Sequence, residues 1–116
     1  MCKKKYVGNF VEETWKQLKK KFSNWKHAEV LEDTIHLWGP SGDTVAVLRK
    51  IDKTIVVYDF SLMLDRFENR VNKYFYKKIK DLLRKILSNY QDPVVKVVRI
   101  CGTRNLEADL NELFSV

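Results

Sequence analysis

The sequence predicts an α+β fold: a single domain, residues 1–116, with an antiparallel meander sheet packed against helices in the order α-β-β-β-α-β-α. Three observations predict it. A chain of 116 residues suits one hydrophobic core. Apolar residues recur with a helical period in two long segments and alternate in the region between them. Glycine and proline stand at turns, with no linker and no internal repeat.

The first helix is expected from about Phe10 to about Asn24, because Asn9 and Glu12 have the spacing of a capping pair. At about 100° per residue, one apolar stripe falls within an arc of roughly 80°; it consists of Val11, Trp15, Leu18, Phe22 and Trp25. This stripe should face the core. The lysines of the helix, among them Lys16, Lys19 and Lys20, should therefore lie in water.

From Ala28 to Phe60 the apolar period changes to two, in the stretches TIHLW, TVAVLRK and TIVVYDF, with GPSGD and DK as turns. These stretches predict three strands, and EVLED before Thr34 could add a short first strand. A later stretch, PVVKVVRIC, reads as the last strand, beginning at Pro93. Asn105 is then expected to cap a short helix that carries Leu106, Leu110 and Leu113.

A second helix is expected from a Ser61 N-cap to about Asn89, a length of roughly 42 Å. Its core stripe comprises Leu64, Phe67, Val71, Phe75, Ile79, Leu82 and Ile86. Leu83, Leu87 and Tyr90 form a second apolar edge, which suggests a homodimer contact between helices. A C-terminal helix wrapped over the same residues is the alternative.

Charge points to a polyanionic partner. The chain carries a formal net charge of +7, and residues 1–26 hold eight basic and two acidic side chains, residues 61–92 eight and four. Such a field favours nucleic acid or an anionic surface, although solubility alone could also explain it. The positive excess is therefore expected on the two helices.

Basic residues recur along the second helix within an arc of roughly 80°; they are Arg66, Arg70, Lys73, Lys77, Lys80 and Arg84. Solvated helix faces usually alternate the sign of their charges, because like pairs at i,i+4 repel. A row of phosphates would relieve that repulsion. A binding surface and an ordinary solvated face both remain open for this stripe.

Aromatic residues share one parity of the predicted strands, namely His36 and Trp38 in one strand and Tyr58 and Phe60 in another. If the aliphatic parity packs on the helices, then His36, Trp38 and Tyr58 lie on an open face, with basic residues such as Arg49, Lys96 or Arg99 near them. Basic residues beside exposed rings are typical of single-strand binders. A sheet covered on both faces is the alternative.

An enzyme is less expected than a binding protein. No P-loop, G-x-G-x-x-G, H-E-x-x-H or G-x-S-x-G is present, and the chain has only two histidines. The element order also resembles the PD-(D/E)xK nucleases, with Asp43 and Asp59 at the positions of the metal-binding acids. Ser61 stands where that pattern has lysine. A metal-dependent or catalytically decayed nuclease is therefore the alternative function, and otherwise no cofactor or metal is expected.

Two cysteines supply neither a disulfide framework nor a zinc cluster, and no apolar stretch follows the basic start MCKKKYVGNF. We therefore expect a cytoplasmic protein without a signal peptide or a membrane partner.

The size, the basic charge, the meander flanked by helices and the long leucine-edged helix together resemble the Thermo-DBP-related single-stranded nucleic-acid-binding proteins of thermophilic archaea. That resemblance implies binding of DNA or RNA single strands in an aromatic, basic cleft, and self-association. It agrees with the residues: the sequence predicts a sequence-tolerant nucleic-acid-binding protein that prefers single strands. The expected contacts are Trp38, Tyr58, His36, Arg49, Lys96, Arg99, Arg66, Arg70, Lys73, Lys77, Lys16, Lys19 and Lys20. A protein-interaction adaptor that uses the edge of the second helix is a third possibility.

Overall fold

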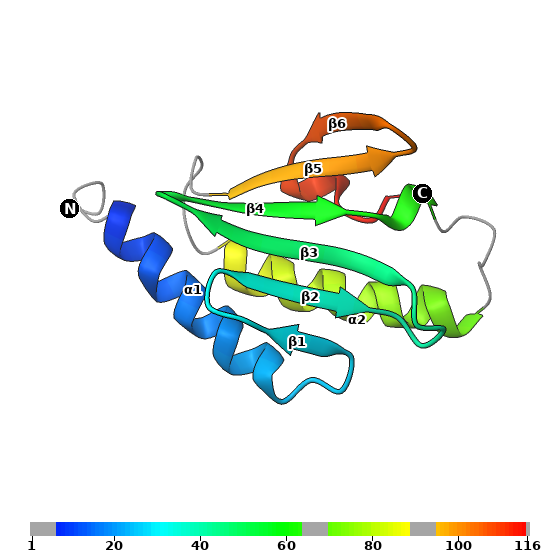
Figure 1. Cartoon of the computed structure of the whole chain (residues 1–116), viewed down its shortest axis with the longest axis horizontal. Helices are drawn as coiled ribbons and strands as arrows, with labels where there is room; N and C mark the ends of the chain where they lie inside the picture. Colours follow the sequence, from blue (N-terminus) through cyan, green and yellow to red (C-terminus); the bar gives the residue numbers. More distant parts are fainter. Residues whose placement is uncertain (1–6, 64–69, 89–94, 116) are drawn as a thin grey trace.

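The computed structural model describes residues 7–63, 70–88 and 95–115 and confirms the α+β class. The described residues form, in chain order, α1 (Val7–Ser23), β1 (Ala28–Val30), β2 (Thr34–Trp38), β3 (Thr44–Ile51), β4 (Thr54–Asp59), the 3-10 turn η2 (Ser61–Met63), α2 (Arg70–Leu87), β5 (Val95–Cys101), β6 (Arg104–Ala108) and η4 (Leu110–Glu112). The two helices lie on one side of the sheet, behind it in Figure 1. None of the described helices is both long and apolar enough to cross a membrane.

The sheet is mixed, with the spatial order β1-β2-β3-β4-β5-β6. Strands β1 to β4 form the predicted antiparallel meander, and β6 pairs antiparallel with β5. Strands β4 and β5 run parallel. Two parallel strands that are neighbours in a sheet must be joined by a crossover connection. The segment between β4 and β5 makes this connection, and α2 lies within it. The meander prediction therefore holds for the first four strands, and the helix between β4 and β5 sets the direction of the fifth.

The turns follow the predicted chemistry. Ile51 pairs with Thr54, so Asp52 and Lys53 make a two-residue loop, with Asp52 at φ 53°. Aspartate tolerates this left-handed backbone better than most side chains do. Val30 pairs with Ile35 across the Glu32 and Asp33 turn, which establishes the short first strand.

Helix α1 buries the predicted stripe of Val11, Trp15, Leu18 and Phe22, and Trp25 just beyond it is half-buried. The indole Nε1 of Trp15 donates to the carbonyl of Glu32 at 2.9 Å, which ties the helix to the β1–β2 turn. The helix already includes Val7, so Asn9 lies within it and does not cap it.

Helix α2 packs the opposite part of the same core, and here the sequence prediction needs a correction. Leu83 is 0% exposed and Leu87 is 1% exposed, both within the core of this one chain. They leave no wet apolar edge, so the predicted dimer contact at these residues is wrong. The C-terminal segment helps cover this helix, because Phe114 stacks on Tyr76 with ring centroids 5.8 Å apart. Tyr90 lies outside the described residues.

The N-terminal part of the predicted second helix lies only partly within the described residues. Ser61 is the first residue of the 3-10 turn η2, where the prediction had the N-cap of an α-helix. The described helix begins at Arg70, and Leu64 and Phe67 of the predicted stripe lie outside the described residues.

The predicted helix after Asn105 is wrong, because Arg104–Ala108 is the edge strand β6. Cys101 pairs with Arg104 across a loop of two residues, and Gly102 at φ 65° makes that hairpin turn. Leu106 is consequently 38% exposed. Asp109 and Glu112 then form a capping box for η4, after which Leu113 is buried.

Candidate functional site

The face of the sheet turned away from the helices carries the predicted aromatic residues. Ile35, Leu37, Ile55 and Val57 are buried on the helix side, so the alternate residues of β2 and β4 point to the other side. We call this second side the open face, because no described helix packs on it (Figure 1). The sequence left the choice between one and two covered faces undecided, and the described residues cover one face with helices.

Two rows of side chains cross the open face. The register defines a ring row of Glu29, His36, Val47, Tyr58, Val98 and Glu107. It also defines a cation row of Thr34, Arg49, Val56 and Lys96. The rows are two residues apart along each strand, which is roughly 7 Å. The basic side chains of Arg49 and Lys96 therefore lie on the same surface as the half-buried rings of His36 and Tyr58.

The rings of the open face are held in place by their neighbours. Trp38 lies edge-on to His36, with ring centroids 5.9 Å apart. The Nε2 atom of His36 lies 2.8 Å from the Oγ1 atom of Thr44, within hydrogen-bonding distance. Both rings and Tyr58 are half-buried, so each keeps part of its surface in water. Rings already fixed in this way lose little freedom when a ligand stacks on them.

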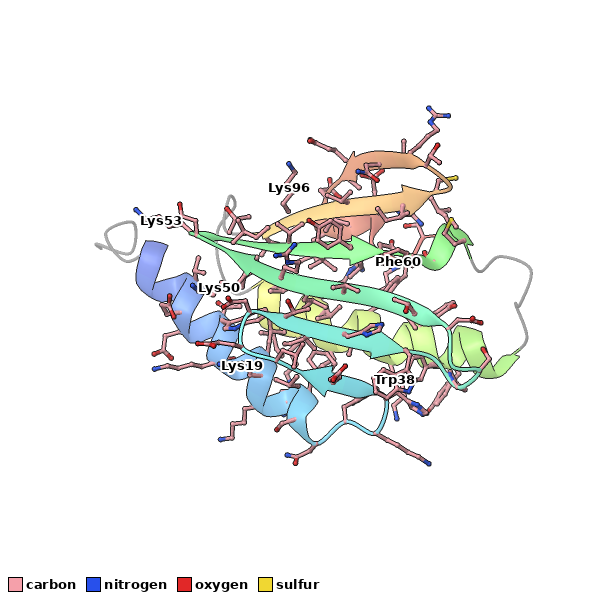
Figure 2. The ribbon with its side chains drawn as sticks, in the orientation of Figure 1. Lys19, Trp38, Lys50, Lys53, Phe60 and Lys96 are labelled. Atoms are coloured by element: carbon pink, nitrogen blue, oxygen red, sulfur yellow. The ribbon has the colours of Figure 1, made fainter. Side chains whose placement is uncertain are left out.

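The cations of the open face are available to a ligand. Arg49 is exposed and has no ion-pair partner within the described part of the chain. Lys96 Nζ lies 3.3 Å from Glu107 Oε2, and both side chains are at least half exposed. An exposed pair of this kind contributes only about 0–1 kcal/mol, so a phosphate can replace the glutamate. Figure 2 shows Lys96 and Lys53 towards one end of the sheet and Trp38 and Phe60 towards the other.

The lysines of α1 do not lie on the open face, because this helix packs on the other side of the sheet (Figure 1). Lys16 and Lys20 are exposed, Lys19 is half-buried, and the helix carrying them packs beside β1. Lys50, at the end of β3, pairs with Glu12 of the same helix at 3.0 Å. These lysines contribute to the positive field near the sheet edge.

The basic stripe of α2 lies on the other side of the sheet from the rings. Lys77 pairs with Asp81 at 3.1 Å, and Arg84 Nη2 donates to the carbonyl of Asn111 at 2.7 Å. Burial, and then the charge of Arg84, lower the pKa of Lys80. Arg70 and Lys73 belong to the first turn of α2, and Arg66 lies outside the described residues. A straight single strand cannot contact this stripe and the open face together.

Arg99 is not on the open face, so that part of the prediction is wrong. It pairs in register with Asp59. Because successive side chains of a strand point to opposite faces of the sheet, this register places both residues on the helix side. Its Nε donates to Asp59 Oδ2 at 3.0 Å, and Asp59 is 0% exposed. Arg99 therefore neutralises a buried carboxylate.

The two acids of the nuclease alternative do not fit a metal site. Asp59 also accepts from the backbone nitrogens of Ser61 and Phe114, each at 2.8 Å, so its oxygens already have three donors. Asp43 lies exposed in the β2–β3 turn. Across residues 7–63, 70–88 and 95–115, no three His, Cys, Asp or Glu side chains gather closely enough to hold a metal ion. The guanidinium of Arg99 takes the place beside Asp59 that a cation would need.

Phe60 and a second group of rings were missing from the predicted site. Phe60 shares the parity of Tyr58, so the alternation of β4 contained the signal. Trp25, His27 and Tyr74 come from three separate segments, and only the tertiary fold brings them together around one pocket.

Comparisons of the chain with known protein families, with curated proteins and with solved structures find no match.

Proposed function

We propose that this protein binds single-stranded nucleic acid, with little sequence preference, across the open face of its sheet. The observation that carries the proposal is the ring row beside the cation row, on a face that no described helix covers. Stacked bases contribute about 1–3 kcal/mol each, and every base has a face that can stack. Phosphates supply the partner that Arg49 lacks among the described residues.

The two rows suggest how a strand would lie. The sugar-phosphate backbone would follow the cation row, with phosphates near Arg49 and Lys96, while bases extend over His36 and Tyr58. These two rings are separated by one strand, or roughly 10 Å, because Val47 stands between them in the register. Trp38 and Phe60 would extend the stacking surface towards the next base. Glu29 and Glu107 close the ring row at its two ends, which disfavours phosphates there and favours them on the cation row.

Duplex DNA suits this surface less well, because its bases are already stacked within the helix and cannot cover the rings. The lysines of α1 would add long-range attraction without reading any base. The resemblance to single-strand-binding proteins noted from the sequence favours the same class of ligand. The homodimer stays a prediction without contact residues, since Leu83 and Leu87 are buried within one chain.

A titration of the purified protein with labelled oligonucleotides tests the proposal. Anisotropy would be measured for single-stranded DNA, the same sequence as RNA, and the matching duplex, each at two salt concentrations. We expect either single strand to bind more tightly than the duplex, with affinity falling as salt rises. Equal or tighter binding of the duplex would reject stacking on the open face. Absence of binding to all three would reject the function.

A further inference from the structure

A pocket of about 340 Å³ opens where the end of α1, the β2–β3 turn and the start of α2 meet. Aromatic and basic side chains line it, among them Trp25, His27, Tyr74, Phe75, Lys26 and Lys78. Among the described residues that line it, none is acidic. Its volume is at the small end of the range for ligand pockets, which suits one nucleotide better than a larger cofactor.

The rings of the pocket are packed against one another but not closed over. Trp25 lies 6.1 Å from Phe75 and His27 lies 5.3 Å from Phe75, as measured between ring centroids. Tyr74 is 65% exposed at the mouth, so its face is accessible to a planar ligand. Lys78 Nζ lies 5.5 Å from the centroid of the Tyr74 ring, which places a cation beside that face. A ligand with both an aromatic ring and a negative charge matches these neighbours.

The pocket is continuous with the open face through its aromatic residues. His27 contacts Phe75 on the pocket side and also lies 6.5 Å from Trp38, between centroids. The backbone nitrogen of Trp38 donates to the carbonyl of His27 at 3.1 Å, which fixes the two residues together. Trp38 in turn contacts His36 of the ring row. A ligand in the pocket and a base on Trp38 would therefore be near neighbours.

One donor near the pocket lacks an acceptor. The indole Nε1 of Trp25 is buried and has no hydrogen-bond partner within the described residues. Buried donors are rarely left in this state, because an unmade hydrogen bond is costly. Trp25 belongs to the lining, so a ligand in the pocket would change the surroundings of its indole group.

The geometry points to a site for one terminal nucleotide of a single strand, with its base against Tyr74 and its terminal phosphate held by Lys26 and Lys78. A terminal phosphate monoester carries nearly two negative charges, whereas each internal phosphate carries one. Two lysines, in a lining whose other described residues carry no acid, match the terminal phosphate. This inference rests on the proposed function, because the strand must reach the pocket from the open face.

The test compares one short DNA strand in three forms, with a 5′-phosphate, with a 3′-phosphate, and with neither. We expect one phosphorylated form to bind about tenfold more tightly than the unphosphorylated strand, the effect of one charge-assisted contact. Lys78→Gln should abolish that gain and leave the affinity for the unphosphorylated strand nearly unchanged. Lys85→Gln, an exposed lysine of the same helix outside the pocket, should keep the gain and is the matched control.

Adenosine monophosphate alone provides the second measurement, through the ¹⁵N-resolved signals of the tryptophan indole groups. We expect the Trp25 signal to shift and that of Trp15, bonded to Glu32, to stay in place. Equal affinity for all three forms of the strand would overturn the inference while leaving the proposed function standing. A shift of Trp25 with the mononucleotide, but no binding of any strand, would reject the proposed function and confirm the pocket as a nucleotide site.

Discussion

Arg99 and Asp59 form an ion pair beneath the sheet, with 3.0 Å between Nε and Oδ2, and the aspartate has no exposed surface. The same carboxylate accepts from the backbone of Ser61 and of Phe114. It thereby joins the end of β4, the turn η2, strand β5 and the C-terminal segment. We infer that this pair maintains the fold, although the sequence alone suggested a binding role for Arg99 and a metal-binding role for Asp59.

Arg99→Met should lower the free energy of unfolding by about 3–5 kcal/mol, because it leaves a buried carboxylate without its counter-charge. Urea denaturation at neutral pH measures the change. Lys96→Met is the matched control on the same strand, since its pair with Glu107 is exposed. That control should change stability by no more than about 1 kcal/mol. Similar small losses for both variants would contradict the structural role of Arg99.

Leu87→Ala should cost about 2–5 kcal/mol, as expected for a leucine truncated inside a packed core. Leu106→Ala on the edge strand β6 serves as the control and should lie within about 0.5 kcal/mol of the wild type. Sedimentation of the folded proteins completes the experiment. If Leu87→Ala left stability unchanged and converted a dimer into a monomer, that result would contradict the burial of Leu87 and support the dimer contact predicted from the sequence.

Lys80→Met should raise the free energy of unfolding at neutral pH only slightly, by about a few tenths of a kcal/mol at most, because solvent screens most of the penalty on this side chain. Burial lowers the pKa of Lys80 below its usual 10.5, so the unfolded chain holds this proton more tightly than the folded chain does. The loss of folding stability caused by the charged Lys80 is present in full below its folded-state pKa. This loss disappears as the pH rises from that pKa towards 10.5. Urea denaturation of wild type and variant at neutral and alkaline pH checks the sign. A stability difference independent of pH would refute this account of Lys80.

The local patterns of the sequence predicted much of the fold. The buried stripe of α1 follows from spacing alone, and so does the parity that separates Ile35 and Leu37 from His36 and Trp38. The DK turn was recognisable because Asp52 is a residue type that tolerates its backbone angle. These features depend on neighbours in sequence.

The errors arose where distant segments decide the outcome. Leu83 and Leu87 looked like an exposed edge because helical periodicity cannot reveal what packs on a helix from other elements. The sequence of β6 is too short and too polar for its alternation to distinguish a strand from a helix. Gly102 was the residue that could have indicated the hairpin turn before it. Arg99 was placed on the wrong face because the sequence alone does not show which side chains of its strand point towards the helices. The pairing of that strand with β4 decides this.

The salt dependence of binding should distinguish the two basic surfaces. Arg49→Gln should reduce the slope of log affinity against log salt by about 0.7, the loss of one phosphate contact on a single strand. Lys77→Gln should leave the slope unchanged, because Lys77 lies on α2 and pairs with Asp81. An unchanged slope for Arg49→Gln with a reduced slope for Lys77→Gln would show that nucleic acid binds to helix α2 and not to the sheet.

The most direct test of the open face follows the indole signals of Trp15, Trp25 and Trp38 by ¹H–¹⁵N correlation spectroscopy. An unphosphorylated single strand would be titrated to saturation, so that the pocket site does not determine the result. The account predicts a large shift of the Trp38 signal and an unchanged Trp15 signal, since Trp15 is buried in the core. An unchanged Trp38 signal at saturation, with shifts confined to the amides of Lys77 and Asp81 on α2, would contradict it.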